Sequence, residues 1–218
     1  DLIKRYREMC LHPEVDSAIE DIVNEAVVSD SNDTPVEIDL DNLNASDGIK
    51  KKVRQEFKYI LDLLDFDKKA HEIYRNWYVD GRLYYHKVID IKKPEEGIQD
   101  LRYIDPLKIR HIRQEKKKDK AKIGPDLRPG DKDKFQSPEL EEYFVYTPKP
   151  SYPTGTMVGG GGVKGIKIAK DSITYCTSGL VDRNKGNVLS YLHKAIKSLN
   201  QLRMIEDSLV IYRLSRAP

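Results

Sequence analysis

Residues 187–212 read NVLSYLHKAIKSLNQLRMIEDSLVIY, and this stretch carries the clearest structural pattern in the chain. Its apolar residues recur at spacings of four, three, four, three, three and four, which is typical of an α-helix with an apolar stripe. They are Val188, Leu192, Ala195, Leu199, Leu202, Ile205 and Leu209. A helix of about 26 residues is about 39 Å long. Because a domain of this size does not readily cover such a helix, we expect a neighbour, either within the chain or from another subunit.

Upstream of this stretch, helical patterns come first and short strand-like segments follow. Helices are predicted to begin at Leu2, Pro13, Asp47 and Asp67, and Gly81 ends the last of them. Strands are predicted over residues 36–40, 82–89, 101–104, 143–146, 165–168 and 173–176. The expected fold class is therefore α+β, with helices packed on small, mostly antiparallel sheets over residues 1–186 and one long helix over residues 187–218.

Composition limits the functions that the chain can have. Of its 218 residues, 34% are charged and 39% hydrophobic, and no apolar run approaches the roughly 20 residues of a membrane-spanning helix. The charged opening lacks the apolar core of a signal peptide, so we expect an intracellular protein with no membrane requirement. A net charge of +2 is low for a protein that grips nucleic acid. The basic run over residues 116–122 lies in a stretch with little to bury, which indicates a solvated loop.

Motifs that would indicate catalysis or metal binding are weak. The glycine run ending at Gly165 lacks the strand before it and the helix after it that a phosphate-binding loop requires. The five histidines and two cysteines show no metal-ligand spacing. Asp80, Asp90 and Asp105 flank predicted strands, where carboxylates usually cap helices and fix turns. We expect no catalytic, cofactor-binding or metal-binding residues.

Aromatic residues gather around the end of the fourth predicted helix and the strand after it. They are Trp77, Tyr78, Tyr84 and Tyr85, with Arg75 and Arg82 nearby. Such a set could stack on bases, but packed aromatics with amphipathic rims are the more common arrangement. The sequence therefore favours a core role for them.

Taken in order, three groups of segments resemble the portal vertex proteins of large myoviruses of the T-even kind. The segments are Tyr6–Met9, Pro13–Asp16 and Asp21–Ala26; Trp77–Lys87, Glu96–Ile98 and Leu101–Pro106; and Ser178–Asp182, Tyr191–Ala195, Asn200–Leu202, Glu206–Asp207, Ile211–Arg213 and Arg216–Pro218. The resemblance covers nearly the whole chain. It omits the loops over residues 114–138 and 147–165, so nothing of the family is transferred to those loops.

The resemblance implies an assembly protein. Such proteins form a homo-oligomeric, dodecameric ring at one vertex of the virion capsid, initiate head assembly in the host cytoplasm and dock the large terminase. Double-stranded DNA passes through the ring, and the major capsid, scaffold or core, and neck proteins are further partners. By this likeness residues 1–186 correspond to the wing and the helix from Asn187 to the approach to the stem. The clip is expected beyond Pro218, because we interpret the chain as a piece of a longer polypeptide.

Three hypotheses follow for function. The leading one is a portal subunit without catalytic residues, in which helix-helix or subunit contacts are made by Leu199, Leu202, Ile205 and Leu209. The alternative is a metal-dependent nucleic-acid enzyme that uses Asp80, Asp90 or Asp105. A third, a monomeric DNA-binding module, predicts binding that falls steeply with salt.

Overall fold

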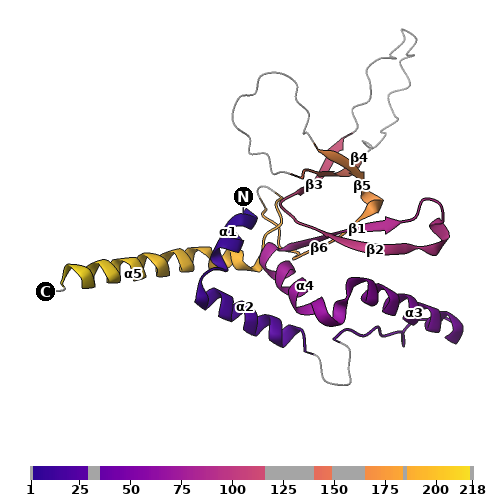
Figure 1. Cartoon of the computed structure of the whole chain (residues 1–218), viewed down its shortest axis with the longest axis horizontal. Coiled ribbons are helices and arrows are strands. Elements are labelled where there is room, and N and C mark those ends of the chain that lie inside the picture. Colours follow the sequence, from indigo (N-terminus) through magenta and orange to yellow (C-terminus); the bar gives the residue numbers. More distant parts are fainter. Residues whose placement is uncertain (1, 29–34, 116–139, 149–164, 184–185, 217–218) are drawn as a thin grey trace, which may run out of the picture. The chain divides into compact units, whose positions relative to one another are not determined.

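The computed structural model describes residues 2–28, 35–115, 140–148, 165–183 and 186–216. The chain divides into two compact units (Figure 1). The first comprises residues 1–106 and 175–218, and the second comprises residues 107–174. None of the helices in the described ranges combines the length and apolar character needed to cross a bilayer.

Four helices open the first unit: α1 (Leu2–Met9), α2 (Pro13–Ala26), α3 (Asp47–Leu64) and α4 (Phe66–Asp80). Pro13 stands at the first turn of α2, where its missing N–H has no helical partner to lose. Asp65 takes a left-handed conformation, with φ of 49°, and separates α3 from α4.

Gly81 ends α4 with φ of 72°, a conformation that side chains rarely adopt. A Cβ at this position would also lie 2.7 Å from the carbonyl oxygen of Leu189 and 2.9 Å from the Cα of Ser190. Only glycine therefore allows the end of α4 to approach the 189–190 backbone so closely.

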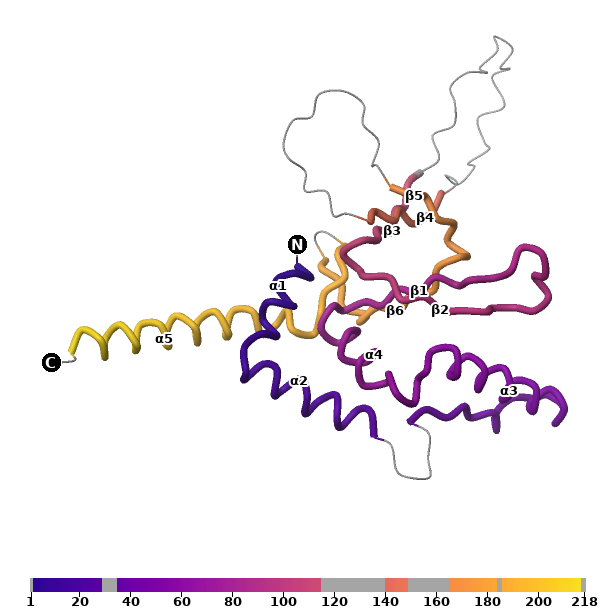
Figure 2. The backbone as a smooth tube through the Cα atoms, viewed as in Figure 1, coloured from indigo at the N-terminus to yellow at the C-terminus, as the bar shows by residue number. Residues whose placement is uncertain are grey.

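The hydrophobic core of the first unit joins residues from both ends of the chain. Its buried members are Tyr6, Met9, Ile19, Val23, Val79, Leu192 and Leu199. They come from α1, α2, α4, the 3-10 helix η3 (Tyr191–Ala195) and α5 (Ile196–Ser215). The first helix and the start of the last one are thus packed together, and this packed region is called the base of α5 (Figure 2).

The sheet of the first unit has the strand order β2-β1-β6. Its strands are β1 (Arg82–Ile89), β2 (Ile98–Ile104) and β6 (Ile173–Thr177), and the division between the two units falls within β6. Strands β1 and β2 are antiparallel, and the pairing includes Tyr84 with Ile104. The register shifts at Val88 and Ile89, next to the turn that holds the short helix η1 (Pro94–Glu96).

The second unit is built around an antiparallel sheet of order β3-β4-β5. The strands are β3 (Ile109–Glu115), β4 (Leu140–Tyr146) and β5 (Ile166–Ala169), followed by the 3-10 helix η2 (Lys170–Ser172). Phe144 is fully buried, and the ring of His111 stacks on it with centroids 4.7 Å apart. Burial lowers the pKa of His111, so its imidazole favours the neutral form.

The structure confirms the α+β class and five of the six predicted strands, and the strand predicted over residues 82–89 has the observed bounds of β1. It also contains β3, which the sequence did not predict. The strand predicted over residues 36–40 is wrong. That segment is not a strand, and neither sheet in the described part of the chain includes it. Alternation of apolar and polar residues produces a strand only where a neighbouring strand supplies backbone partners.

The predicted start of the last helix at Asn187 is also wrong, because α5 begins at Ile196 after η3. The backbone of residues 187–189 bonds to another segment instead. The N–H of Asp182 donates to the carbonyl of Asn187 (2.9 Å), and the N–H of Leu189 donates to the carbonyl of Leu180 (2.8 Å). Groups bound in this way are not available to a helical ladder, so tertiary contacts override the helical period.

Candidate functional site

The candidate functional site is α5, whose first turns are held by the base. Ser190 is fully buried; its hydroxyl donates to the carbonyl of Tyr78 (2.9 Å) and accepts from the N–H of Leu192 (3.1 Å). The side chain of Tyr191 stacks on Tyr78, with ring centroids 5.3 Å apart. Leu199 contributes to the core cluster and is 7% exposed. These contacts fix where α5 leaves the base.

Beyond Leu199, α5 is no longer packed against the core of the first unit. Every described residue from Asn200 to Arg216 is exposed. Among the residues predicted from the sequence to make contacts, Leu202, Ile205 and Leu209 are 39%, 63% and 48% exposed, whereas Leu199 is buried in its own unit. Apolar side chains are therefore exposed along about four turns of helix, and the described part of the chain does not cover them. We call residues 201–215 the exposed length of α5.

The apolar side chains of this exposed length do not lie on one side. Leu202, Ile205 and Leu209 follow the predicted spacing and form a first stripe, which Tyr212 extends. Met204, Ile211 and Leu214 are also exposed, and they lie on another side of the helix, because residues two apart point in nearly opposite directions. This second stripe was missed in the sequence. The spacing of seven between Met204 and Ile211 was the available signal.

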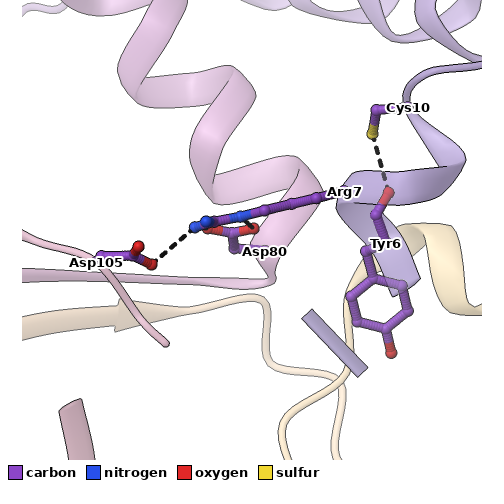
Figure 3. Close-up of polar contacts among 5 residues, drawn as sticks. All are labelled: Tyr6, Arg7, Cys10, Asp80 and Asp105. Atoms are coloured by element: carbon purple, nitrogen blue, oxygen red, sulfur yellow. Dashed lines mark hydrogen bonds and ion pairs between the residues drawn. The ribbon is translucent and has the colours of Figure 1, made fainter. Parts of the chain in front are cut away.

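The candidate carboxylates of the alternative hypothesis are only partly brought together. Arg7 of α1 donates from Nε and Nη2 to the two carboxylate oxygens of Asp80 (2.9 and 2.7 Å), and from Nη2 to Asp105 (2.9 Å) (Figure 3). Asp80 is 1% exposed. The pKa of Arg7 is raised, chiefly by its hydrogen bond with Asp80. Asp90 takes no part in this contact, and its carboxylate instead accepts from the N–H of Lys92 in the turn after β1 (2.9 Å).

This arrangement describes an ion cluster that ties α1 to the end of α4 and the end of β2. A metal ion bound to Asp80 and Asp105 would have to displace a guanidinium that already bonds both carboxylates. Within the described ranges, histidine, cysteine and carboxylate side chains form no group of three or more that could hold a metal. The geometry accordingly supports a structural role for the cluster.

The aromatic residues pack as a core. Trp77 lies against Tyr74 and Tyr191, with ring centroids 5.5 Å apart in each pair, and Tyr84 is 6% exposed. Arg82 donates from Nη2 to the carbonyl of Val188 (2.6 Å). These contacts agree with the core role favoured by the sequence. The basic run over residues 116–122 and the glycine run before Gly165 lie outside the described residues.

The two cysteines are free thiols. Cys10 lies beside the core cluster, and its Sγ donates to the carbonyl of Tyr6 (3.2 Å; Figure 3). Burial raises the pKa of Cys10 to about 11. Because the thiolate is the reactive form, this cysteine acts as a packing residue rather than a nucleophile.

A family model and two individual proteins that match this chain are all described as portal proteins. A family model described as Bacteriophage T4-like portal protein (Gp20) matches residues 1–218. The chain is 36% identical over 224 residues to the portal protein of Vibrio phage KVP40, and all of the chain aligns with 40% of that protein. It is 31% identical over 226 residues to the portal protein of Salmonella phage ViI, covering 38% of it. The chain therefore spans about two fifths of these relatives' length, and it belongs to the T4-like portal protein family.

Proposed function

We propose that this chain is part of a phage portal subunit, a ring-forming component of the capsid vertex. In this role it initiates capsid assembly, docks the large terminase and conducts double-stranded DNA during packaging and ejection. The observation that carries the proposal is the exposed length of α5, in a chain whose family membership is established. A helix that extends beyond the core with exposed apolar side chains is stabilised when another protein covers them. In this proposal other copies of the same subunit cover them.

The positions of the two stripes support a ring rather than a pair. In a two-fold dimer the same patch meets itself, whereas a head-to-tail contact uses two different patches. The first stripe and the second stripe lie on different sides of α5, so each helix has a surface for each of two neighbours. Contacts of this kind close into a ring when the rotation between copies allows it. The dodecameric count comes from the family likeness alone.

Burial of these side chains in such contacts would favour assembly. Full burial of a leucine, isoleucine or methionine side chain contributes about 1.5–3 kcal/mol. Leu202, Ile205 and Leu209 begin 39–63% exposed, so each retains a good part of that energy for contact with another subunit. Because every copy in a closed ring makes the contact twice, small gains per side chain accumulate over the assembly.

Residues 1–186 are proposed to form the wing-like region and the residues from 187 the approach to the stem. The partners that follow are the major capsid and scaffold or core proteins, the neck proteins and the large terminase. No cofactor and no catalytic residue belong to this proposal. A net charge of +2 suits a conduit, since DNA that must slide is not held by many phosphate contacts.

The proposal is tested by placing a charge on the first stripe of α5. In the full-length subunit, Leu202→Asp buries a carboxylate in the contact between copies, so negative-stain images are expected to show single subunits where the unmodified protein shows rings. Arg203→Asp places a carboxylate on the same exposed helix but outside both stripes, because the residues three and four positions away on either side belong to neither stripe, and it is expected to leave the rings intact. Rings formed normally by Leu202→Asp would contradict the assignment of α5 to subunit contacts.

A further inference from the structure

A groove of about 570 Å³ lies where α1 meets the first turns of α5. Leu2, Ile196 and Met204 provide its apolar lining, and Arg5 and Lys197 provide its charged part. Both cations are exposed, and within the described part of the chain neither forms an ion pair. The groove is therefore apolar and positively charged, and a complementary occupant would be an apolar surface with a carboxylate beside it.

The first stripe of α5 has this complementary character. Glu206 lies four residues after Leu202 and three before Leu209, so on a helix it borders the stripe. It is exposed, and within the residues that the structure describes it forms no ion pair. Leu202 and Leu209 thus present apolar side chains with a carboxylate at their edge.

The groove and the stripe of one molecule cannot bind each other. Both include residues of α5: Met204 lines the groove, while Leu202, two residues earlier, points to nearly the opposite side of the helix. Lys197 and Glu206 are nine residues apart, which separates them by about 14 Å along the helix axis. Among the described residues of α5, the stripe of another copy therefore offers the groove a surface of matching chemistry.

We propose that the α1–α5 groove of each subunit receives the first stripe of α5 from the next subunit, with Glu206 of one copy beside Lys197 and Arg5 of its neighbour. This inference rests on the proposed function, because it names the partner surface inside the ring. It makes α1 part of the subunit contact and gives the contact a direction, groove to stripe. Opposite charges at such a contact fix register and reject wrong pairings more than they add affinity.

The test uses two charge-reversal variants of the full-length subunit, each unable to pair with itself. Lys197→Glu places a carboxylate in the groove opposite Glu206 and leaves Arg5 as the one cation that the groove had beside Lys197. Glu206→Lys places an ammonium group on the edge of the stripe, opposite a groove that stays basic. Each variant alone is expected to lose rings by about tenfold or more, since like charges then meet at every contact. Mixed in equal amounts they are expected to regain rings, because alternating copies place opposite charges at every contact.

Several outcomes separate this inference from the function on which it rests. If the unmodified subunit forms rings but the mixture does not, or if either variant alone forms rings as well as the unmodified subunit, the groove-to-stripe contact is wrong and the portal assignment stands. If the unmodified subunit forms no rings, the proposed function itself fails. Both substituted residues are exposed, and matching thermal unfolding of the two variants and the unmodified subunit confirms that folding is not the cause.

A second measurement does not depend on charge. A subunit carrying both Lys197→Cys and Glu206→Cys is expected to form a ladder of disulfide-linked multimers on mild oxidation. Two thiols are oxidised and the added oxidant is reduced for each bond formed, and the distance along the helix prevents closure within one chain. The parent subunit, which keeps Cys10 and Cys176, is the control. If the double variant contains monomers and no disulfide-linked multimers after oxidation, the proposed contact is wrong.

Discussion

Helix α5 has two lengths that contain similar residues and differ in what covers them. Up to Leu199 its apolar side chains, Ile196 and Leu199, pack into the base, against α1, α2 and α4. From Gln201 to Ser215 all of its side chains are exposed, including seven large apolar ones beyond Leu202. The spacing of apolar residues continues from one length into the other. Periodicity therefore identifies the helix, and the surrounding elements decide which part of it stays exposed.

This comparison predicts that substitutions in the base act on folding, and that substitutions in the exposed length act on assembly. The largest effect is expected for Tyr6→Ala. Tyr6 is fully buried in the core cluster, and its hydroxyl lies 2.9 Å from Nδ1 of His193. Loss of the ring should lower the free energy of unfolding by about 4 kcal/mol.

The change is measured by urea unfolding of the 218-residue chain, followed through Trp77, its single tryptophan, which lies next to Tyr191 in the base. Tyr212→Ala is the matched control, since that ring is 53% exposed on α5. Equal losses of stability in the two variants would remove the distinction between base and exposed length.

Leu199→Ala is expected to have the next largest effect. This leucine belongs to the same helix as the exposed stripes but is 7% exposed, and it packs in the core cluster. Removing its side chain leaves a cavity in the base and should lower the free energy of unfolding by about 3 kcal/mol. The same urea titration measures it. A negligible change would place the boundary between the two lengths before Leu199.

A smaller loss is expected when the ion cluster of the base is broken. Arg7→Ala leaves the buried carboxylate of Asp80 without its two hydrogen bonds from the guanidinium. Because the Arg7 side chain is 38% exposed and water can replace part of the contact, we expect a loss of about 2 kcal/mol, below the usual range for a fully buried pair.

The matched control is Arg102→Ala, whose side chain is 67% exposed and pairs with Asp100 on the surface. Such a pair contributes about 0–1 kcal/mol. Arg7→Lys should recover only part of the loss, because an ammonium group does not bond both carboxylates as a planar guanidinium does. Full recovery by lysine would show that charge alone, without the forked geometry, stabilises the base.

Local features of the fold could be predicted because local chemistry determines them. Pro13 marks the start of α2, Gly81 marks the end of α4, and the aromatic and β-branched residues of 82–89 form β1 as expected. The segment over residues 36–40 has an equally regular alternation but lacks a partner strand in the described sheets. Alternation thus predicts which side chains of a segment point to the same side. Whether another strand pairs with that segment depends on the whole fold.

The candidate site was predicted in part for the same reason. Spacing placed Leu199, Leu202, Ile205 and Leu209 on one stripe, but it could not separate the buried Leu199 from the three exposed residues, because that burial depends on helices at the other end of the chain. The contact of Arg7 with Asp105 joins residues 98 positions apart, which no local pattern reports. The second stripe was missed because a search for one apolar face passes over residues placed on another.

The smallest effect on folding is expected for Leu209→Ala, and it gives the most direct comparison with Leu199→Ala. The substitution is the same and the helix is the same, but Leu209 is 48% exposed. Alanine favours helix at least as well as leucine, so the helix itself is not weakened. The free energy of unfolding of the chain should change by less than about 0.5 kcal/mol.

Ring assembly of the full-length subunit should be affected by Leu209→Ala although folding is not, because this substitution removes a side chain from the proposed contact with the next copy. The expected result is a higher protein concentration for half-maximal ring formation with Leu209→Ala, measured by sedimentation, while folding stays unchanged. A loss of stability equal to that of Leu199→Ala would mean that the exposed length is covered by its own chain. The separation of folding from assembly along one helix would then be lost, and with it the physical reason for assigning α5 to the contact between subunits.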